Sequence, residues 1–345
     1  MKLSDLGFVD IEYIPLETNE YNLLRGIMGI RIGNEYFLIK HANTILKFLS
    51  DGSFVTIIGT EGRGPNEFLG VHDVDIDKKT QEIYLVSGRQ RKFFVYSESG
   101  EFIRTFQSPL WTTNFRITED GILCYSLNSF GNIETSYNLI DTDGRIIKDF
   151  PNRYPYKIEG TYQIFTYENI FYQFNNRLFK KEVYSDTVYV FENMDFKPHL
   201  VIEHGERQLT TQIRTDLNMV DIRDNLIIQS KLFEFGDFIY HVFIFNRQVY
   251  SYIGSKKNDF SVLIKSDQGL INDLDGGPNI RPRTVKDDNT IISWVDALQL
   301  KNHVASEEFK NSAPKFPEKK KELEKLANSL KETDNPVLMM VRLKK

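Results

Sequence analysis

The chain has 345 residues, of which 41% are hydrophobic and 26% charged, and a net charge of -5, a balance typical of a folded globular protein. The single cysteine, Cys124, excludes an internal disulfide and a cysteine-based zinc site, and the acidic charge balance argues against a nucleic-acid partner. No run of about 18 apolar residues occurs, so the sequence predicts no transmembrane segment.

Near the N-terminus, apolar and aromatic residues alternate with polar ones in segments 35–40, 44–49 and 54–59. This alternation predicts β-strands. The second and third segments are separated by Ser50-Asp51-Gly52-Ser53. An Asp-Gly pair between two such segments predicts a hairpin, because glycine tolerates the positive φ of the turn.

The same unit recurs twice further along the chain. Its turn glycines are Gly52, Gly100 and Gly144, which are 48 and 44 residues apart. A period of roughly 40–50 residues with about four strands in each copy is typical of propeller blades. A stack of helix pairs would instead show a period of 3.6 residues.

Later copies are less regular. Hairpins are predicted within 178–191, 238–253 and 281–295, and short amphipathic helices over 206–219 and 319–332. Strands 9–17 and 336–343 are isolated at the two ends, and pairing them would close a ring and cover two strand edges. The sequence therefore predicts an all-β, six-bladed propeller with four-stranded antiparallel blades and two short helical insertions, forming a single domain. Its approximate blades are residues 24–60, 68–107, 112–150, 157–200, 223–263, and 278–343 together with 8–17.

Four segments carry a resemblance to a known family. They are residues 11–18, the loop 62–68, the Asn-Asp-x-x-Gly-Gly motif within 271–277, and the tail 326–338. Together they resemble a six-bladed propeller family of anaerobic gut bacteria that is related to NHL-repeat propellers. The resemblance implies a location in the periplasm or cell envelope. Members are commonly exported and many are lipoproteins, although no signal peptide is visible here, so we expect either a cytoplasmic protein or one whose leader or lipid-anchor signal was removed.

The loop 62–68 has the sequence Gly-Arg-Gly-Pro-Asn-Glu-Phe, and it lacks the Gly-Lys-Ser/Thr of a phosphate-binding loop. Arg63 and Glu67 are candidates for facing a ligand. The alternative is a connector between blades, in which Arg63 contacts Glu67 or the backbone.

Asp73, Asp75 and Asp77 alternate along a predicted strand, which suggests a Ca²⁺ site. An EF-hand loop starting at Asp73 would need Gly at 78 and Glu at 84, where the chain has Lys78 and Tyr84. We therefore expect a strand that ends in an Asp-led turn.

None of the six histidines lies in a recognisable metal motif, so no metal ligand and no cofactor are assigned. A metal site assembled from separate blades remains an open alternative. Cys124 lies in an apolar segment and is expected to be a buried, unreactive side chain.

The central axis of a propeller is where polar side chains of the innermost strands converge. The candidate ligand-binding residues there are Arg25, His72, Asp73, Arg116 and Arg283. Such a set favours a small anionic ligand or an acidic segment of a partner protein. The alternative is a water-filled channel lined by structural salt bridges.

From these features we expect a monomeric, non-catalytic binding or scaffold propeller of the cell envelope. The alternative is a metal-dependent lactonase or an NHL-type lyase that uses the central channel.

Overall fold

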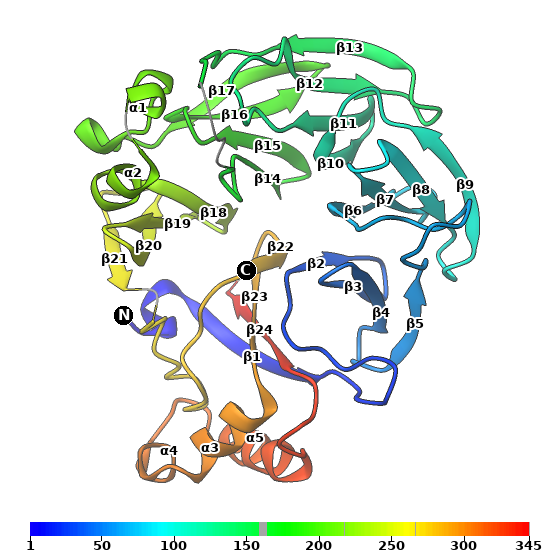
Figure 1. The fold of residues 1–345 in the computed structure, drawn as a ribbon. Helices are drawn as coiled ribbons and strands as arrows, with labels where there is room; N and C mark the ends of the chain where they lie inside the picture. Colours follow the sequence, from blue (N-terminus) through cyan, green and yellow to red (C-terminus); the bar gives the residue numbers. More distant parts are fainter. Residues whose placement is uncertain (159–163, 217, 266, 345) are drawn as a thin grey trace.

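Six four-stranded antiparallel sheets surround a central axis in the part of the chain that the structure describes (Figure 1). The computed structural model describes residues 1–158, 164–216, 218–265 and 267–344. Each sheet is one blade, and its first strand in the repeat lies nearest the axis. The predicted six-bladed propeller is confirmed.

The first three blades follow one another without inserted helices. Blade 1 contains β2 (Gly29–Ile32), β3 (Tyr36–His41), β4 (Thr44–Leu49) and β5 (Phe54–Ile58). Blade 2 contains β6 (Asp73–Ile76), β7 (Ile83–Ser87), β8 (Lys92–Tyr96) and β9 (Phe102–Gln107). Blade 3 contains β10 (Thr112–Thr118), β11 (Gly121–Ser126), β12 (Thr135–Ile140) and β13 (Ile146–Pro151).

The remaining blades complete the ring. Blade 4 contains β14 (Asn169–Phe174), β15 (Arg177–Glu182), β16 (Thr187–Glu192) and β17 (Asp195–Val201). Blade 5 contains β18 (Ile228–Phe235), β19 (Phe238–Phe245), β20 (Gln248–Ser255) and β21 (Ser261–Lys265). Blade 6 contains β22 (Thr284–Asp287), β23 (Thr290–Val295), β24 (Val337–Leu343) and β1 (Phe8–Pro15).

The core lies between the blades. In β3, Leu38 packs with blade 2 residues such as Val74, whereas Phe37 and Ile39 pack with blade 6 residues such as Leu338. Because both faces of a middle strand such as β3 are covered, it carries a continuous apolar run rather than an alternating one.

Blade 6 joins the two ends of the chain. β1 pairs antiparallel with β24 in a register that places Ile11 opposite Val341. Asp10 forms ion pairs with Arg342 and, at 2.6 Å, with the Nζ of Lys319. The predicted closure of the ring by the terminal strands is confirmed.

Each of the three repeated glycines combines a positive φ with a close contact to the preceding blade. Gly52, Gly100 and Gly144 have φ of 91°, 93° and 86°, a region that favours glycine. A Cβ on Gly52 would also lie 2.1 Å from the backbone oxygen of Pro15, in the outer strand of the preceding blade. The repeat visible in the sequence therefore reflects both the turn and the blade contact.

Helices occupy the two predicted insertions, with differences in detail. Residues 206–219 do not form one helix: a 3-10 turn η2 (Gly205–Arg207) precedes α1 (Thr211–Asp216) and α2 (Met219–Asn225). Asn218 starts α2 because its Oδ1 accepts hydrogen bonds from the backbone N–H groups of Val220 and Asp221 at 2.9 and 3.0 Å. Leu217, part of the predicted apolar stripe, lies outside the described residues.

The second insertion contains α5 (Pro317–Ser329), close to the predicted 319–332, with Pro317 in its first turn. It also contains α3 (Ala297–Ala305) and α4 (Glu307–Asn311), which the sequence analysis missed. A 3-10 turn η1 (Leu3–Leu6) precedes β1. Among the described residues, no helix has the length and apolar character needed to cross a membrane.

Candidate ligand-binding site in the central channel

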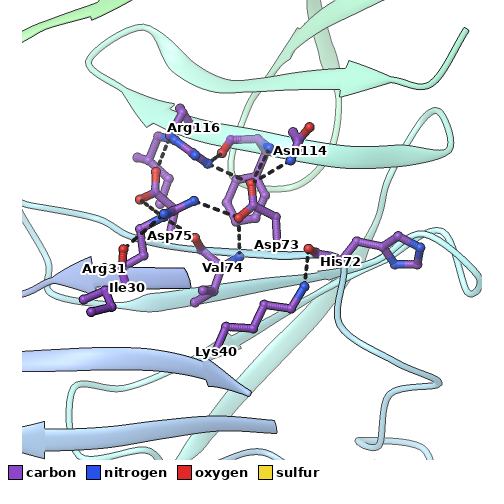
Figure 2. Close-up of polar contacts among 11 residues, drawn as sticks. Ile30, Arg31, Lys40, His72, Asp73, Val74, Asp75, Asn114 and Arg116 are labelled. Atoms are coloured by element: carbon purple, nitrogen blue, oxygen red, sulfur yellow. Dashed lines mark hydrogen bonds and ion pairs between the residues drawn. The ribbon is translucent and has the colours of Figure 1, made fainter. Parts of the chain in front are cut away.

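Four charged side chains from the inner strands of blades 1 to 3 meet in one cluster (Figure 2). They are Arg31 on β2, Asp73 and Asp75 on β6, and Arg116 on β10. Arg31 Nη2 donates to Asp73 Oδ1 at 2.9 Å, and Arg116 Nη1 donates to Asp73 Oδ2 at 2.7 Å. The Asp73 carboxylate therefore bridges guanidinium groups from two neighbouring blades.

Backbone donors complete the environment of Asp73. The N–H of Val74 donates to Oδ1 at 2.9 Å, and the N–H of Phe115 donates to Oδ2 at 3.2 Å. Burial alone would raise the pKa of Asp73, but the charges of Arg116 and Arg31 outweigh it and bring the pKa to about 2. Asp73 is therefore ionised at neutral pH.

Asp75 is the second carboxylate of this cluster. Its Oδ2 accepts a hydrogen bond from the N–H of Ile117 at 2.9 Å, and its Oδ1 lies 3.8 Å from Arg31 Nε. Burial raises the pKa of Asp75 above its usual value, although Arg116 and Arg31 act in the opposite direction. Two carboxylates thus balance two guanidinium groups, and this cluster works as an ionic clamp that joins three blades.

Next to the clamp, Lys40 on β3 donates through Nζ to the backbone oxygen of His72 at 2.6 Å. The His72 ring points away from Asp73 (Figure 2), and its Nδ1 accepts a hydrogen bond from the N–H of Gly88 at 3.1 Å. Burial and the charge of Lys40 both lower the pKa of His72. His72 therefore supports the turn of blade 2, whereas Asp73 belongs to the charged cluster.

Arg25, one of the candidate channel residues, does not lie on an inner strand. β2 begins only at Gly29, and Arg25 is an exposed residue of the preceding loop. Arg31 occupies the inner strand instead. The short sequence Gly29-Ile30-Arg31-Ile32 has the alternation of a strand, but four residues gave too weak a signal.

Arg283 precedes β22 and is half-buried, with its guanidinium carbon 5.5 Å from the centre of the Trp294 ring. Arg283 is not part of the ionic clamp. Its Nε is buried and has no hydrogen-bond partner among the described residues. The inner strand of blade 5 adds Lys231, which the sequence analysis did not single out. The structure thus brings Asp73 and Arg116 together and leaves Arg25 and Arg283 apart from them.

In the loop 62–68, Glu67 stabilises the backbone. Its Oε2 accepts a hydrogen bond from the N–H of Gly64 at 2.7 Å, while Arg63 is exposed. A Cβ on Gly62 would lie 2.0 Å from the same carboxylate oxygen. This geometry corresponds to the connector interpretation of the loop, with a Glu–backbone contact in place of an Arg–Glu pair.

The other ionisable candidates have structural partners. Asp77 ends β6 in the expected turn, because its Oδ1 accepts a hydrogen bond from the N–H of Lys79 at 2.8 Å. Cys124 is fully buried, as expected, and burial raises its pKa to about 12. Within the described part of the chain, no group of three or more His, Cys, Asp or Glu side chains could hold a metal ion.

A ring of four-stranded blades around a polar axis defines this protein as a six-bladed β-propeller. The chain belongs to the DUF4934 family, a domain of unknown function, whose profile matches residues 1–342. Among curated proteins, no match to the sequence was found.

Solved structures share the fold. A protein of Bacteroides fragilis NCTC 9343 that is described as exported matches with a TM-score of 0.76 and 20% identity, over 100% of this chain and 97% of that chain. A DUF4221 family member from Bacteroides vulgatus matches with a TM-score of 0.58 and 11% identity, over 98% and 97% of the two chains. At these identities the likeness shows the fold alone.

Proposed function

We propose that this chain is a non-catalytic binding or scaffold propeller of the cell envelope whose central channel takes up an anionic ligand or an acidic segment of a partner protein. One observation carries the proposal: cations outnumber carboxylates near the axis. The cations on or directly beside the inner strands include Arg31, Lys40, Arg116, Lys231 and Arg283, whereas the carboxylates on these strands that are not exposed are Asp73, Asp75 and Glu234. A positive channel within a chain of net charge -5 would concentrate anions at one place rather than over the whole surface.

The cellular location in this proposal draws on the family resemblance. It is supported by the similar Bacteroides fragilis protein that is described as exported. The proposal also includes a monomeric state and a precursor with an export or lipid-anchor signal. A binding role also suits the ionic clamp, because a preorganised and rigid channel lowers the entropic cost of holding a ligand.

Anion binding can be tested by isothermal titration calorimetry with citrate and a hexaglutamate peptide as anionic probes. A hexaglutamine peptide is the matched uncharged control. We expect at least one anionic probe to bind saturably and hexaglutamine not to bind. Absence of binding by both anionic probes would contradict the proposal.

The enzyme alternative is tested in the same samples by NMR. We expect δ-valerolactone to remain intact with the protein in the presence of Ca²⁺ or Mg²⁺. Metal-dependent hydrolysis faster than in protein-free buffer would favour the lactonase alternative and overturn the non-catalytic assignment.

A further inference from the structure

Two cationic residues lie on adjoining inner segments of blades 5 and 6, and neither forms an ion pair with a residue that the structure describes. Lys231 is on β18, and Arg283 immediately precedes β22, a strand that is in contact with β18. Lys231 makes no ion pair or hydrogen bond with any residue that the structure describes. The charge of Arg283 is near enough to Lys231 to contribute to the lowering of its pKa.

The other charged residue of the same strand has ion-pair partners. Glu234, three residues after Lys231, accepts a hydrogen bond from Lys256 Nζ at 2.7 Å and lies 2.9 Å from His199 Nε2. Across the channel, Arg31 and Arg116 share the carboxylate of Asp73. Lys231 and Arg283 thus differ from Glu234, Arg31 and Arg116, each of which has an ion-pair partner among the described residues.

Leaving two cations together and partly out of water is unfavourable, because each loses hydration and repels the other. Burial, reinforced by the charge of Arg283, lowers the pKa of Lys231 to about 8. The Nε of Arg283 is also a buried donor without an acceptor among the described residues. An oxyanion placed between the two side chains would satisfy the charge and supply the missing acceptor.

The two cations differ in ways that suit such a ligand. The Arg283 guanidinium, with its carbon 5.5 Å from the centre of the Trp294 ring, presents a planar fork of donors whose orientation the aromatic contact restricts. Lys231 provides a compact charge with three donors. Together they offer two positive charges, which match a dianion better than a single carboxylate.

We propose that Lys231 and Arg283 form a binding site for a dianionic oxyanion group, a sulfate or phosphate that is either free or carried by a larger ligand. This inference rests on the proposed function of the channel as a ligand site. It specifies which part of the channel binds and which chemical group is recognised.

Isothermal titration calorimetry of the full chain with sodium sulfate tests the assignment, with sodium chloride at equal ionic strength as the blank. We expect one sulfate per chain, and binding at least about tenfold weaker for Lys231→Met and for Arg283→Gln, since each loses a charged hydrogen bond. Lys231→Arg, which keeps the charge, should bind within a few-fold of the wild type. The matched control is Lys286→Met, which removes an exposed cation from β22 and should leave the affinity unchanged.

Thermal melting without sulfate gives an independent readout. Lys231→Met should melt at or above the wild-type temperature, because it removes a repelled and desolvated charge. A marked decrease would reveal a stabilising partner for Lys231 and overturn the assignment. Equal weakening of sulfate binding by Lys286→Met would also overturn it.

The titrations separate this inference from the proposed function. Binding of citrate or hexaglutamate without binding of sulfate would refute the dianion site and leave the proposed function standing. Binding of sulfate that neither Lys231→Met nor Arg283→Gln weakens would refute the assigned residues alone. Failure of sulfate and both other anionic probes to bind would refute the site and the proposed function together.

To distinguish the source of the dianion, the same titration is repeated with inorganic phosphate and with glucose 6-phosphate. Equal affinity for both would assign recognition to the oxyanion itself. Tighter binding of the sugar phosphate, again weakened by Lys231→Met, would assign it to an oxyanion carried by a larger ligand. Absence of binding by phosphate and sulfate alike would contradict the site.

Discussion

Replacing Asp73 with asparagine removes the charge that joins blades 1, 2 and 3. In Asp73→Asn the side chain keeps one oxygen acceptor, but its amide group turns donors toward guanidinium groups that are donors themselves. Arg31 and Arg116 would then be left with Asp75, which lies 3.8 Å from Arg31 Nε, as the remaining carboxylate. We expect a clear loss of stability without a change of fold.

The size of the loss follows from the environment of Asp73. Its pKa falls from 3.8 to about 2 on folding, which at 1.36 kcal/mol per pH unit corresponds to roughly 2.5 kcal/mol. Removing one partner of a buried ion pair costs about 3–5 kcal/mol. The side chains of Arg31 and Arg116 remain 24% and 12% exposed, so water offsets part of this loss. We expect Asp73→Asn to lower the free energy of unfolding by about 2–4 kcal/mol at pH 6.

Urea denaturation of the wild type and Asp73→Asn at pH 6 and pH 3 tests this expectation. Folding lowers the pKa of Asp73, so its contribution is present above the unfolded value of 3.8 and is lost as the pH falls through about 2. The difference between the two proteins should therefore shrink by about half at pH 3. The control Asp120→Asn changes an exposed carboxylate on the turn between β10 and β11 and should have little effect. A difference at pH 6 as small as that of the control, or one independent of pH, would refute the reasoning.

Three other changes test the closure, the connector and the anion site. Deleting residues 1–20 removes β1 and exposes the edge of β24. We therefore expect a lower melting temperature, or self-association in size-exclusion chromatography. A monomer that melts at the wild-type temperature would contradict the closure. Gly62→Val should lower the melting temperature more than Arg63→Ala, because the added Cβ would collide with Glu67, and the reverse order would make Arg63 a structural residue. Sulfate affinity should fall about tenfold between pH 7 and pH 9, because Lys231, with a pKa of about 8, loses its charge while the Arg283 guanidinium stays protonated. An affinity that calorimetry shows to be constant over this range would exclude Lys231 as a ligand.

The sequence predicted those parts of the fold that depend on local chemistry. The hairpin 238–253 was found because its turn, Asn246-Arg247, separates two long alternating strands, and both turn residues have positive φ, 47° and 58°. The repeat was clear only where a glycine is required, at 52, 100 and 144. In blade 4 the corresponding turn is a two-residue turn formed by Asn193 and Met194, with φ of 52° and 54°, and it therefore leaves no glycine in the sequence.

The site was harder to predict because its contacts join different blades. Arg116 was expected to be free for a ligand, yet it pairs with Asp73, which is 43 residues earlier. The sequence contains both residues but no signal of their pairing, which depends on β6 lying beside β10. The isolation of Lys231 is likewise a property of three-dimensional packing, since unpaired and paired lysines have the same local sequence signal.

The most direct measurement is a crystal structure of the full chain soaked with a few millimolar sodium selenate, an analogue of sulfate whose selenium scatters anomalously. We expect one strong anomalous peak at the axis between β18 and β22, within hydrogen-bond distance of Lys231 Nζ and the Arg283 guanidinium. The same soak of Lys231→Met crystals should lose that peak. An empty channel in the wild type, or a peak that persists in the variant, would contradict this expectation.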